Sequence, residues 1–222
     1  MIRTEKRDRS IFRRLLLHSL AGSAALLSLS LPGCIGRSAP APMIEHYTFE
    51  YPSPPFANLS RLEQTIKVER FSVAKAFNTV SMVYRPEPFK LDTYASNRWI
   101  VNPGDMTSDY LLRDLRNSGL FRAAFSYRDY EDARFVLGGG VEEFLEIDEG
   151  NTRSAVMALS VTLLDMSRTG TPDRLVFQKG YRSVEPVADA DPAGLARAMS
   201  KGMASVSAQI IKDVHEAVAN LP

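Results

Sequence analysis

Cysteine and histidine are the side chains of this sequence best suited to covalent or metal chemistry, and they are few. The 222 residues include one cysteine, Cys34, and three histidines, of which only His46 and His215 follow it. Neither histidine has a companion at the spacing of a metal site or a catalytic triad, so we interpret both as solvated or structural. Cys34 remains as the reactive side chain that needs an explanation.

Two further groups could be taken for catalytic machinery. Alternate side chains of a strand share a face, so Glu142, Glu146 and Asp148 would lie together and could act as paired carboxylates. We prefer a solvated sheet face to acid/base catalysis. The run of glycines at residues 138–140 invites comparison with a phosphate-binding loop, but such loops lead from a strand into a helix, and no helix start follows here. A bulge or a close backbone approach is the preferred explanation.

The motifs of two large enzyme classes are missing from the chain. There is no G-x-x-x-x-G-K-[ST] motif, so the chain is not a P-loop ATPase. The G-x-S-x-G elbow of the α/β-hydrolases is also missing. We therefore predict no catalytic residue, no metal site and no cofactor, and we expect that the protein is not an enzyme.

The residues that lead to Cys34 have the pattern of an export signal. Basic residues concentrate before residue 15, and residues 15–31 carry no charge. This order is typical of a secretory signal, which is removed from the mature protein. A retained membrane helix is the alternative, since about 17–25 residues suffice to cross a bilayer. The serine and alanine content and the small Gly33 argue against that alternative, and we predict a signal peptide over residues 1–33.

The four residues Leu31-Pro32-Gly33-Cys34 resemble the lipobox of bacterial lipoproteins. The resemblance implies cleavage before Cys34, a diacylglyceryl thioether on its sulfur and an amide-linked acyl chain such as palmitate on its nitrogen. Two or three acyl chains hold a protein at a bilayer far more firmly than one. The lipid also occupies the only thiol, which leaves no disulfide or thiolate chemistry. Ile35, in place of an aspartate, resembles the pattern for sorting to the outer membrane, with the domain on its periplasmic face.

The charge of the mature chain argues against nucleic acid as a partner. The formal charge of the whole chain is +1, from 27 basic and 26 acidic residues. Six of those basic residues and two of the acidic ones precede Cys34, which leaves 21 against 24 and a formal charge of −3. A mildly acidic domain lacks the positive potential that phosphate backbones require.

The rest of the sequence predicts an α+β fold. Residues 34–46 are expected to be the lipidated cysteine and a flexible tether rich in Gly, Ser, Ala and Pro, and residues 47–222 a single domain. Alternating apolar residues predict strands over residues 47–51, 66–71, 80–84, 120–127, 135–147, 153–164 and 175–184.

Two helices are predicted from their end signals. One follows a cap at Asp105 or Thr107 and stops at Gly119. The other starts at Asp191-Pro192 and carries a stripe of apolar residues at steps of three and four: Leu195, Met199, Met203, Val206, Ile210, Val214, Ala217 and Leu221. We expect two layers, a largely antiparallel sheet with these two main helices packed on one face.

The order of several short motifs resembles the ABC-type transport auxiliary lipoprotein family, the PqiC-like proteins. These motifs are Tyr47-Thr48-Phe49, Val83-Tyr84-Arg85, Arg98-Trp99 followed by Pro103, residues 111–115, Ser118-Gly119-Leu120-Phe121 and the region of Phe144. The resemblance implies a lipid-anchored, non-catalytic accessory component of an MCE/ABC-type envelope lipid transport system. Its partner would be the periplasm-spanning MCE-domain protein, together with that protein's permease and ATPase.

Arg98 and Trp99 are the candidate partner-binding residues, because arginine and tryptophan are enriched at interface hot spots. Core packing of Trp99 is the alternative, since large aromatic residues are mostly buried. The sequence leaves self-association open. A structural or regulatory envelope lipoprotein, such as an assembly factor or an activator of cell-wall synthases, is the alternative function, because related folds serve unrelated functions.

Overall fold

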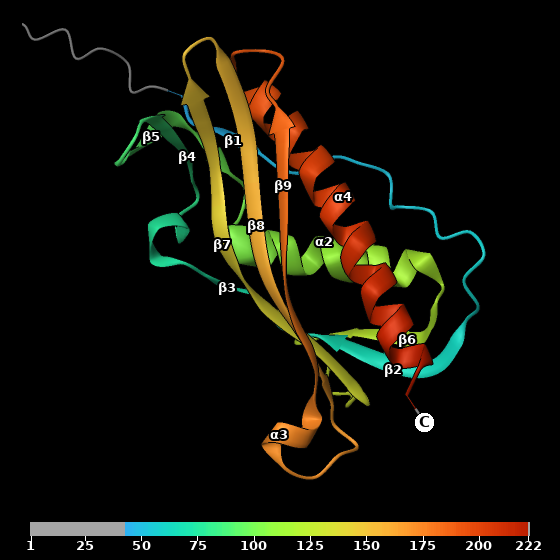
Figure 1. Ribbon diagram of the computed structural model, residues 1–222. Coiled ribbons are helices and arrows are strands. Elements are labelled where there is room, and N and C mark those ends of the chain that lie inside the picture. The colour runs from blue at the N-terminus through green and yellow to red at the C-terminus, as the bar shows by residue number, and fades with distance from the viewer. Residues whose placement is uncertain (1–42, 222) are drawn as a thin grey trace, which may run out of the picture. The chain divides into compact units, whose positions relative to one another are not determined.

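The computed structural model of the protein describes residues 43–221 (Figure 1). The predicted signal peptide, Cys34 and the tether up to residue 42 lie outside the described residues. The strands are β1 (Glu45–Tyr47), β2 (Leu62–Val68), β3 (Ser72–Val73), β4 (Ser81–Glu87), β5 (Lys90–Trp99), β6 (Phe121–Ser126), β7 (Phe135–Glu149), β8 (Thr152–Asp165) and β9 (Leu175–Pro186). The helices are the short 3-10 turn η1 (Lys75–Phe77), α2 (Pro103–Ser118), α3 (Thr171–Arg174) and α4 (Pro192–Ala219).

Strand β7 is the central strand of a strongly curled, mixed sheet (Figure 1). Its 15 residues span about 50 Å at about 3.3 Å per residue. One edge forms a long antiparallel ladder with β8, which continues into β9. The other edge is shared along its length by β2, β3 and β4, which all pair with β7 in parallel. The predicted α+β class is confirmed. The sheet is mixed because β2, β3 and β4 run parallel to β7, whereas β8 runs antiparallel to it.

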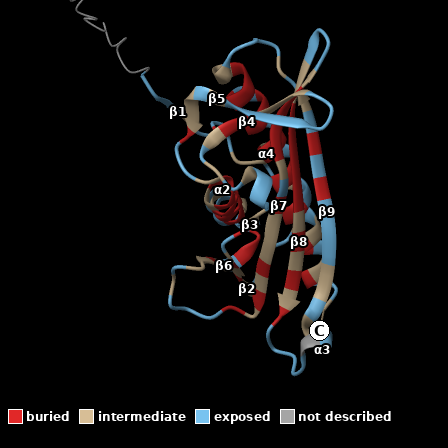
Figure 2. Ribbon diagram, turned by 90° about the vertical axis from the view of Figure 1, so that its left-hand side faces the viewer, coloured by how far each residue is buried: buried red, intermediate tan, exposed pale blue. Residues whose placement is uncertain are grey.

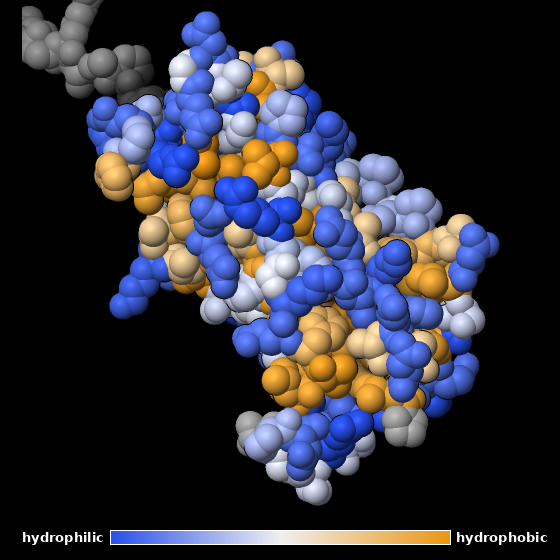
Figure 3. Space-filling view, viewed as in Figure 1, coloured by the Kyte–Doolittle hydropathy of each residue, from blue (hydrophilic) through white to orange (hydrophobic). Residues whose placement is uncertain are grey.

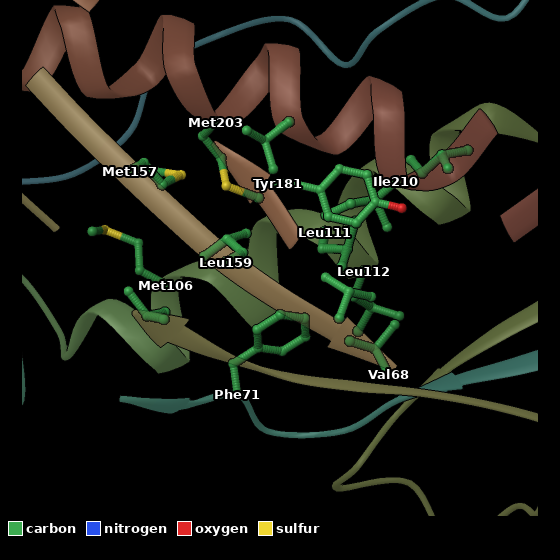
Figure 4. Packing of buried hydrophobic residues seen from close by; sticks show 14 of the residues in the cluster. Val68, Phe71, Met106, Leu111, Leu112, Met157, Leu159, Tyr181, Met203 and Ile210 are labelled. Atoms are coloured by element: carbon green, nitrogen blue, oxygen red, sulfur yellow. The ribbon is translucent and has the colours of Figure 1, made fainter. Parts of the chain in front are cut away.

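Helices α2 and α4 cover one face of the sheet, and most of the core lies between them and β7, β8 and β9. Figure 4 shows Met203 and Ile210 of α4 directed toward Leu111 of α2 and Leu159 of β8. The predicted inward face of β8 is confirmed, since its alternate residues are all buried: Ala155, Met157, Leu159, Val161 and Leu163. Each fully buried Leu, Ile or Met side chain contributes about 1.5–3 kcal/mol, so this layer supplies most of the driving force for folding.

Local capping explains where the two long helices begin and end. The carboxylate of Asp191 accepts a hydrogen bond from the Gly194 N–H at 2.6 Å and starts α4, as predicted. Helix α2 starts at least three residues earlier than predicted, because the amide oxygen of Asn102, and not Asp105 or Thr107, accepts from the Gly104 N–H at 3.0 Å and acts as its cap. Asp105 pairs instead with Arg70. Gly119 ends α2 at φ 64°, a conformation that glycine adopts without strain.

The hairpin of β4 and β5 differs most from the sequence-based prediction. Strand β4 continues through Pro86. The pairing of β4 with β5 is irregular between Tyr84 and Glu87, so the N–H that proline lacks is not needed for a ladder hydrogen bond there. Strand β5 was not predicted. Its first residues are exposed on both faces, and only Trp99 at its end is buried (Figure 2). The predicted strand at residues 47–51 is replaced by β1, which stops at Tyr47.

Candidate anchoring and partner-binding site

The segment that would connect Cys34 to the domain enters along the edge of the sheet. Strand β1 pairs in parallel with the end of β5, with Glu45 opposite Asn97 and Tyr47 opposite Trp99. The Ile100 N–H donates to the Tyr47 carbonyl at 2.8 Å and closes this pairing. The main chain after Tyr47 then passes α4 (Figure 1) and is hydrogen-bonded to Tyr110 of α2 and to Ser200 of α4. The chain leading from the predicted anchor is therefore integrated into the fold from its first described residues.

Trp99 is a core residue, with 1% of its surface exposed. Its ring lies 5.2 Å from that of Phe144 in an edge-to-face arrangement and 6.0 Å from that of Phe49, measured between centroids. Such pairs add about 0.5–1.5 kcal/mol beyond the area that they bury. The position of Trp99 favours the core-packing alternative over a role as an interface anchor: it joins β5 to β7 and to the segment after β1.

Arg98 faces away from this aromatic cluster. It lies opposite His46 of β1 and Ser81 of β4 in the sheet, and its side chain is half-buried. Its Nε is buried and has no hydrogen-bond partner among the described residues. A buried donor without a partner is unfavourable by about 1–3 kcal/mol. Of the two predicted residues, Arg98 is thus the one whose bonding is incomplete.

A buried carboxylate, Asp114 of α2, attaches the N-terminal segment to both helices. One oxygen accepts from the Tyr51 hydroxyl at 2.8 Å and from the Ser207 hydroxyl of α4 at 2.7 Å. The other accepts from the Ser53 hydroxyl at 2.8 Å and from the Arg113 guanidinium at 2.7 Å. Asp114 is fully buried. Three separate segments therefore meet at one charged group, and we call these residues the Asp114 hub.

Two further contacts hold the same segment. The Tyr110 hydroxyl donates to the Phe49 carbonyl, and the Glu50 N–H donates to the Ser200 hydroxyl of α4 at 3.0 Å. The guanidinium of Arg113 lies 4.3 Å from the centre of the Tyr51 ring, within range of a cation–π interaction. Burial, followed by the negative charge of Asp114, raises the pKa of Tyr51 far above its ordinary value. Tyr51 therefore stays a neutral donor at all physiological pH values.

Sequence reasoning missed the Asp114 hub, although a signal existed. Asp114 lies three residues after Leu111 and one before Leu115, on the apolar side of α2. A carboxylate within an apolar stripe has to be paired when the stripe is buried. Its partners could not be named from the sequence, because Ser207 is 93 residues away along the chain.

A pocket of about 450 Å³ opens beside the hub, between α2 and the end of β6. Its charged residues are largely paired with one another: Arg116 with Asp129 at 3.3 Å and Arg128 with Asp109 at 3.5 Å. The third arginine, Arg113, is bound to Asp114. Because each guanidinium already has a carboxylate partner, the pocket has no unbalanced charge that would select an anionic ligand.

The position of Glu146 shows that the preferred interpretation of Glu142, Glu146 and Asp148 as one solvated sheet face is wrong. It is buried, with 1% of its surface exposed, and accepts a hydrogen bond from the Tyr94 hydroxyl at 3.0 Å. Desolvation raises the pKa of Glu146. The three carboxylates do not share a solvated face, because a bulge between Val141 and Glu143 interrupts the alternation and leaves Glu142 exposed. Glu146 and Asp148 remain neighbours, and Arg153 pairs with both of them, at 3.7 and 3.4 Å.

The histidines and glycines have structural positions. His46 is exposed, and His215 is buried with its Nε2 at 2.8 Å from the Ser60 carbonyl. A Cβ on Gly139 would collide with the Ser160 carbonyl and with the Phe71 ring, which confirms the expected close backbone approach. Within residues 43–221, no three His, Cys, Asp or Glu side chains are grouped so that they could hold a metal ion. Over the same residues, no helix has the length and apolar character needed to cross a membrane.

The fold and the site define an α+β domain whose N-terminal segment is bound tightly across its helices. The chain belongs to the family described as the ABC-type transport auxiliary lipoprotein component, which matches residues 47–211. Membership in this family makes the protein an envelope lipoprotein with an auxiliary role in transport. No curated protein matches the sequence.

Solved structures share the fold. Protein XCC0632 from Xanthomonas campestris, a member of family DUF330, is 20% identical, with a TM-score of 0.71 over 79% of this chain and 97% of its own. A second structure, described as an uncharacterized protein, is 14% identical, with a TM-score of 0.60 over 78% of this chain and 99% of its own. At these identities the likeness concerns the fold alone.

Proposed function

We propose that the protein is a lipid-anchored, non-catalytic accessory component of an MCE/ABC-type envelope lipid transport system. It docks the periplasm-spanning MCE-domain protein at the outer membrane. The observation that carries this proposal is the family match, which spans residues 47–211 and thus nearly all of the described chain. The partner's permease and ATPase supply the energy, in agreement with the missing P-loop motif of this chain.

The firm attachment of the N-terminal segment supports an anchoring role. A subunit that docks a partner at a membrane needs a firm link between its folded domain and the tether that leads to its lipid anchor. The pairing of β1 with β5 and the Asp114 hub provide that link. We place the acyl chains on Cys34 and a partner contact at Arg98, with Trp99 holding the end of β5 in place from the core.

Crosslinking in intact cells, followed by purification of the membrane-extracted protein, tests the proposal. The expected result is recovery of an MCE-domain protein, and Arg98→Ala should lower its yield. Arg182→Ala is the matched control, since Arg182 is an exposed arginine of β9 that pairs with Glu143. Recovery of cell-wall synthases alone would refute the transport role and favour a regulatory lipoprotein.

Acylation has a separate test. Intact-mass measurement should find a mature chain that begins at Cys34 and carries two or three acyl chains. Cys34→Ala should release the protein from membranes. A mature chain that carries no acyl group, or that does not begin at Cys34, would disprove the anchor.

A further inference from the structure

The tip of the β4–β5 hairpin carries the most exposed large apolar side chain among the described residues. Phe89 has a relative exposure of 108%, which means that its ring contacts no other part of the described protein. Leu91, two residues later, is also exposed. Exposed apolar groups that a fold does not use for its own packing mark sites of contact with proteins or membranes. On the face shown in Figure 3, hydrophobic residues gather in the region of this hairpin and near α3.

The backbone conformation at Phe89 is strained, so the exposed ring lowers the stability of the fold. Glu87 and Lys90 are partners in the ladder, so Pro88 and Phe89 form a two-residue turn. Phe89 has φ 68°, the conformation of the third position of a type II turn, at which glycine is usual. For a bulky residue this conformation is an outlier, because the Cβ comes too close to the following carbonyl oxygen. A strained residue that forms no internal contact indicates a function outside the domain.

The surroundings of Phe89 favour a lipid bilayer over water. The nearest charges, Glu87 and Lys90, pair with each other at 3.2 Å, so the tip has no net charge. Pro88 has no N–H that would need a partner after removal from water. Phenylalanine and leucine are typical of segments that enter the boundary between head groups and acyl chains.

The position of the hairpin fits a membrane on the side of the anchor. Strand β1 lies next to β5 at Asn97, eight residues after Phe89. Glu45 and the tip are therefore at most about 32 Å apart, at about 3.3 Å per strand residue and one strand spacing. Glu45 is the eleventh residue after Cys34, which allows a reach of about 36–40 Å. The tether is long enough for the bilayer that holds Cys34 to meet the hairpin tip.

We propose that the β4–β5 hairpin is a second membrane contact, which inserts Phe89 into the lipid bilayer that holds the acylated Cys34. The inference rests on the anchoring part of the proposed function but needs no transport partner. With a flexible tether alone, the domain would rotate freely above the membrane. A second contact fixes which surface of the domain faces the periplasm, and so where a partner has to approach.

Fluorescence quenching by brominated lipids tests the insertion. The full-length, acylated protein is reconstituted into phosphatidylethanolamine–phosphatidylglycerol vesicles whose acyl chains carry bromine. Phe89→Trp should lose roughly half of its added emission, because the ring lies about 5–10 Å deep in the boundary region. The wild-type protein gives the background of the buried Trp99, the single tryptophan of the chain.

Tyr130→Trp is the matched control. Tyr130 is an aromatic residue that is 101% exposed, and it lies in the loop before β7, whereas β4 pairs with β7 near Glu146. Eleven residues of β7 separate Phe135 from Glu146, about 36 Å of strand, so a tryptophan at position 130 should keep its emission. The same weak quenching at positions 89 and 130, in protein that floats with the vesicles, would overturn the hairpin contact and leave the anchor intact. Crosslinking of position 89 to a second copy of the chain without quenching would also overturn it. Protein that does not float with the vesicles would overturn both the anchor and the contact.

Discussion

The substitution Asp114→Asn would reveal how strongly the N-terminal segment is held. The carboxylate accepts hydrogen bonds from Tyr51, Ser53, Ser207 and Arg113, and asparagine retains one acceptor oxygen while placing an NH₂ group against donors. Hydrogen bonds to a charged group are worth about 1.5–3 kcal/mol each, and removal of one partner of a buried ion pair costs about 3–5 kcal/mol. Because Arg113 is one-third exposed and regains water, we expect a loss of about 3 kcal/mol.

Urea unfolding measures that loss, with the m-value as a check that the denatured state is unchanged. A loss of about 3 kcal/mol corresponds to a decrease in Tm of about 6–12 °C for a domain of this size. Hydrogen exchange at the Glu50 amide, which is bound to Ser200, should become faster by a larger factor than exchange in β8.

Asp109→Asn is the control, since Asp109 is an exposed carboxylate of the same helix, paired with Arg128 at 3.5 Å. Exposed pairs contribute about 0–1 kcal/mol. If both substitutions change the free energy of unfolding equally, the hub does not hold the segment and the reasoning is wrong.

Three other substitutions test single groups. Burial raises the pKa of Glu146, so the contribution of this side chain to stability is present below the unfolded pKa of about 4.3 and is lost as pH rises through the folded pKa. Glu146→Gln should therefore stabilise the protein by about 1 kcal/mol at pH 8 and not at pH 4. The measurement is Tm at the two pH values. The Arg134 guanidinium holds the pKa of Asp165 well below its usual range, so its contribution is present above about 3.9 and is lost as pH falls below that value. Asp165→Asn should cost about 3 kcal/mol at pH 7 and flatten the acid limb of a stability profile; a limb of unchanged slope would contradict this. Phe89→Gly should increase the free energy of unfolding by about 1 kcal/mol, which is measured as a higher urea midpoint. A lower midpoint would show that the ring packs against the domain.

The predictable parts of the fold are those that their own residues determine. Helix α4 has its cap, its proline and its apolar stripe within one continuous segment, and strand β8 has an apolar residue at every second position from Ala155 to Leu163. The family resemblance could be recognised for a related reason, since each of its motifs is a short continuous segment, although most of them lie in β1, β4, β5 and α2. For each of them the sequence contains the whole signal.

The missed parts depend on distant neighbours. Strand β5 has few apolar residues and forms because β4 and β1 pair with it on both sides. Glu146 is buried because Tyr94 of β5 lies over it, and Trp99 is buried because Phe49 and Phe144 converge on it from two other segments. No local pattern predicts such burial, because the environments of Glu146 and Trp99 are made by side chains that lie 45 or more residues away along the chain.

The central place of β7 has a consequence for biogenesis. Strands β2, β3 and β4 all come earlier in the chain than the strand that they pair with. During secretion, when the amino-terminal part emerges first, these segments have unsatisfied edges until residues 135–149 cross the membrane. Pairing that is remote in sequence is slow, and open edges favour aggregation. A holding chaperone that shields the first half of the polypeptide should therefore increase the yield of folded protein.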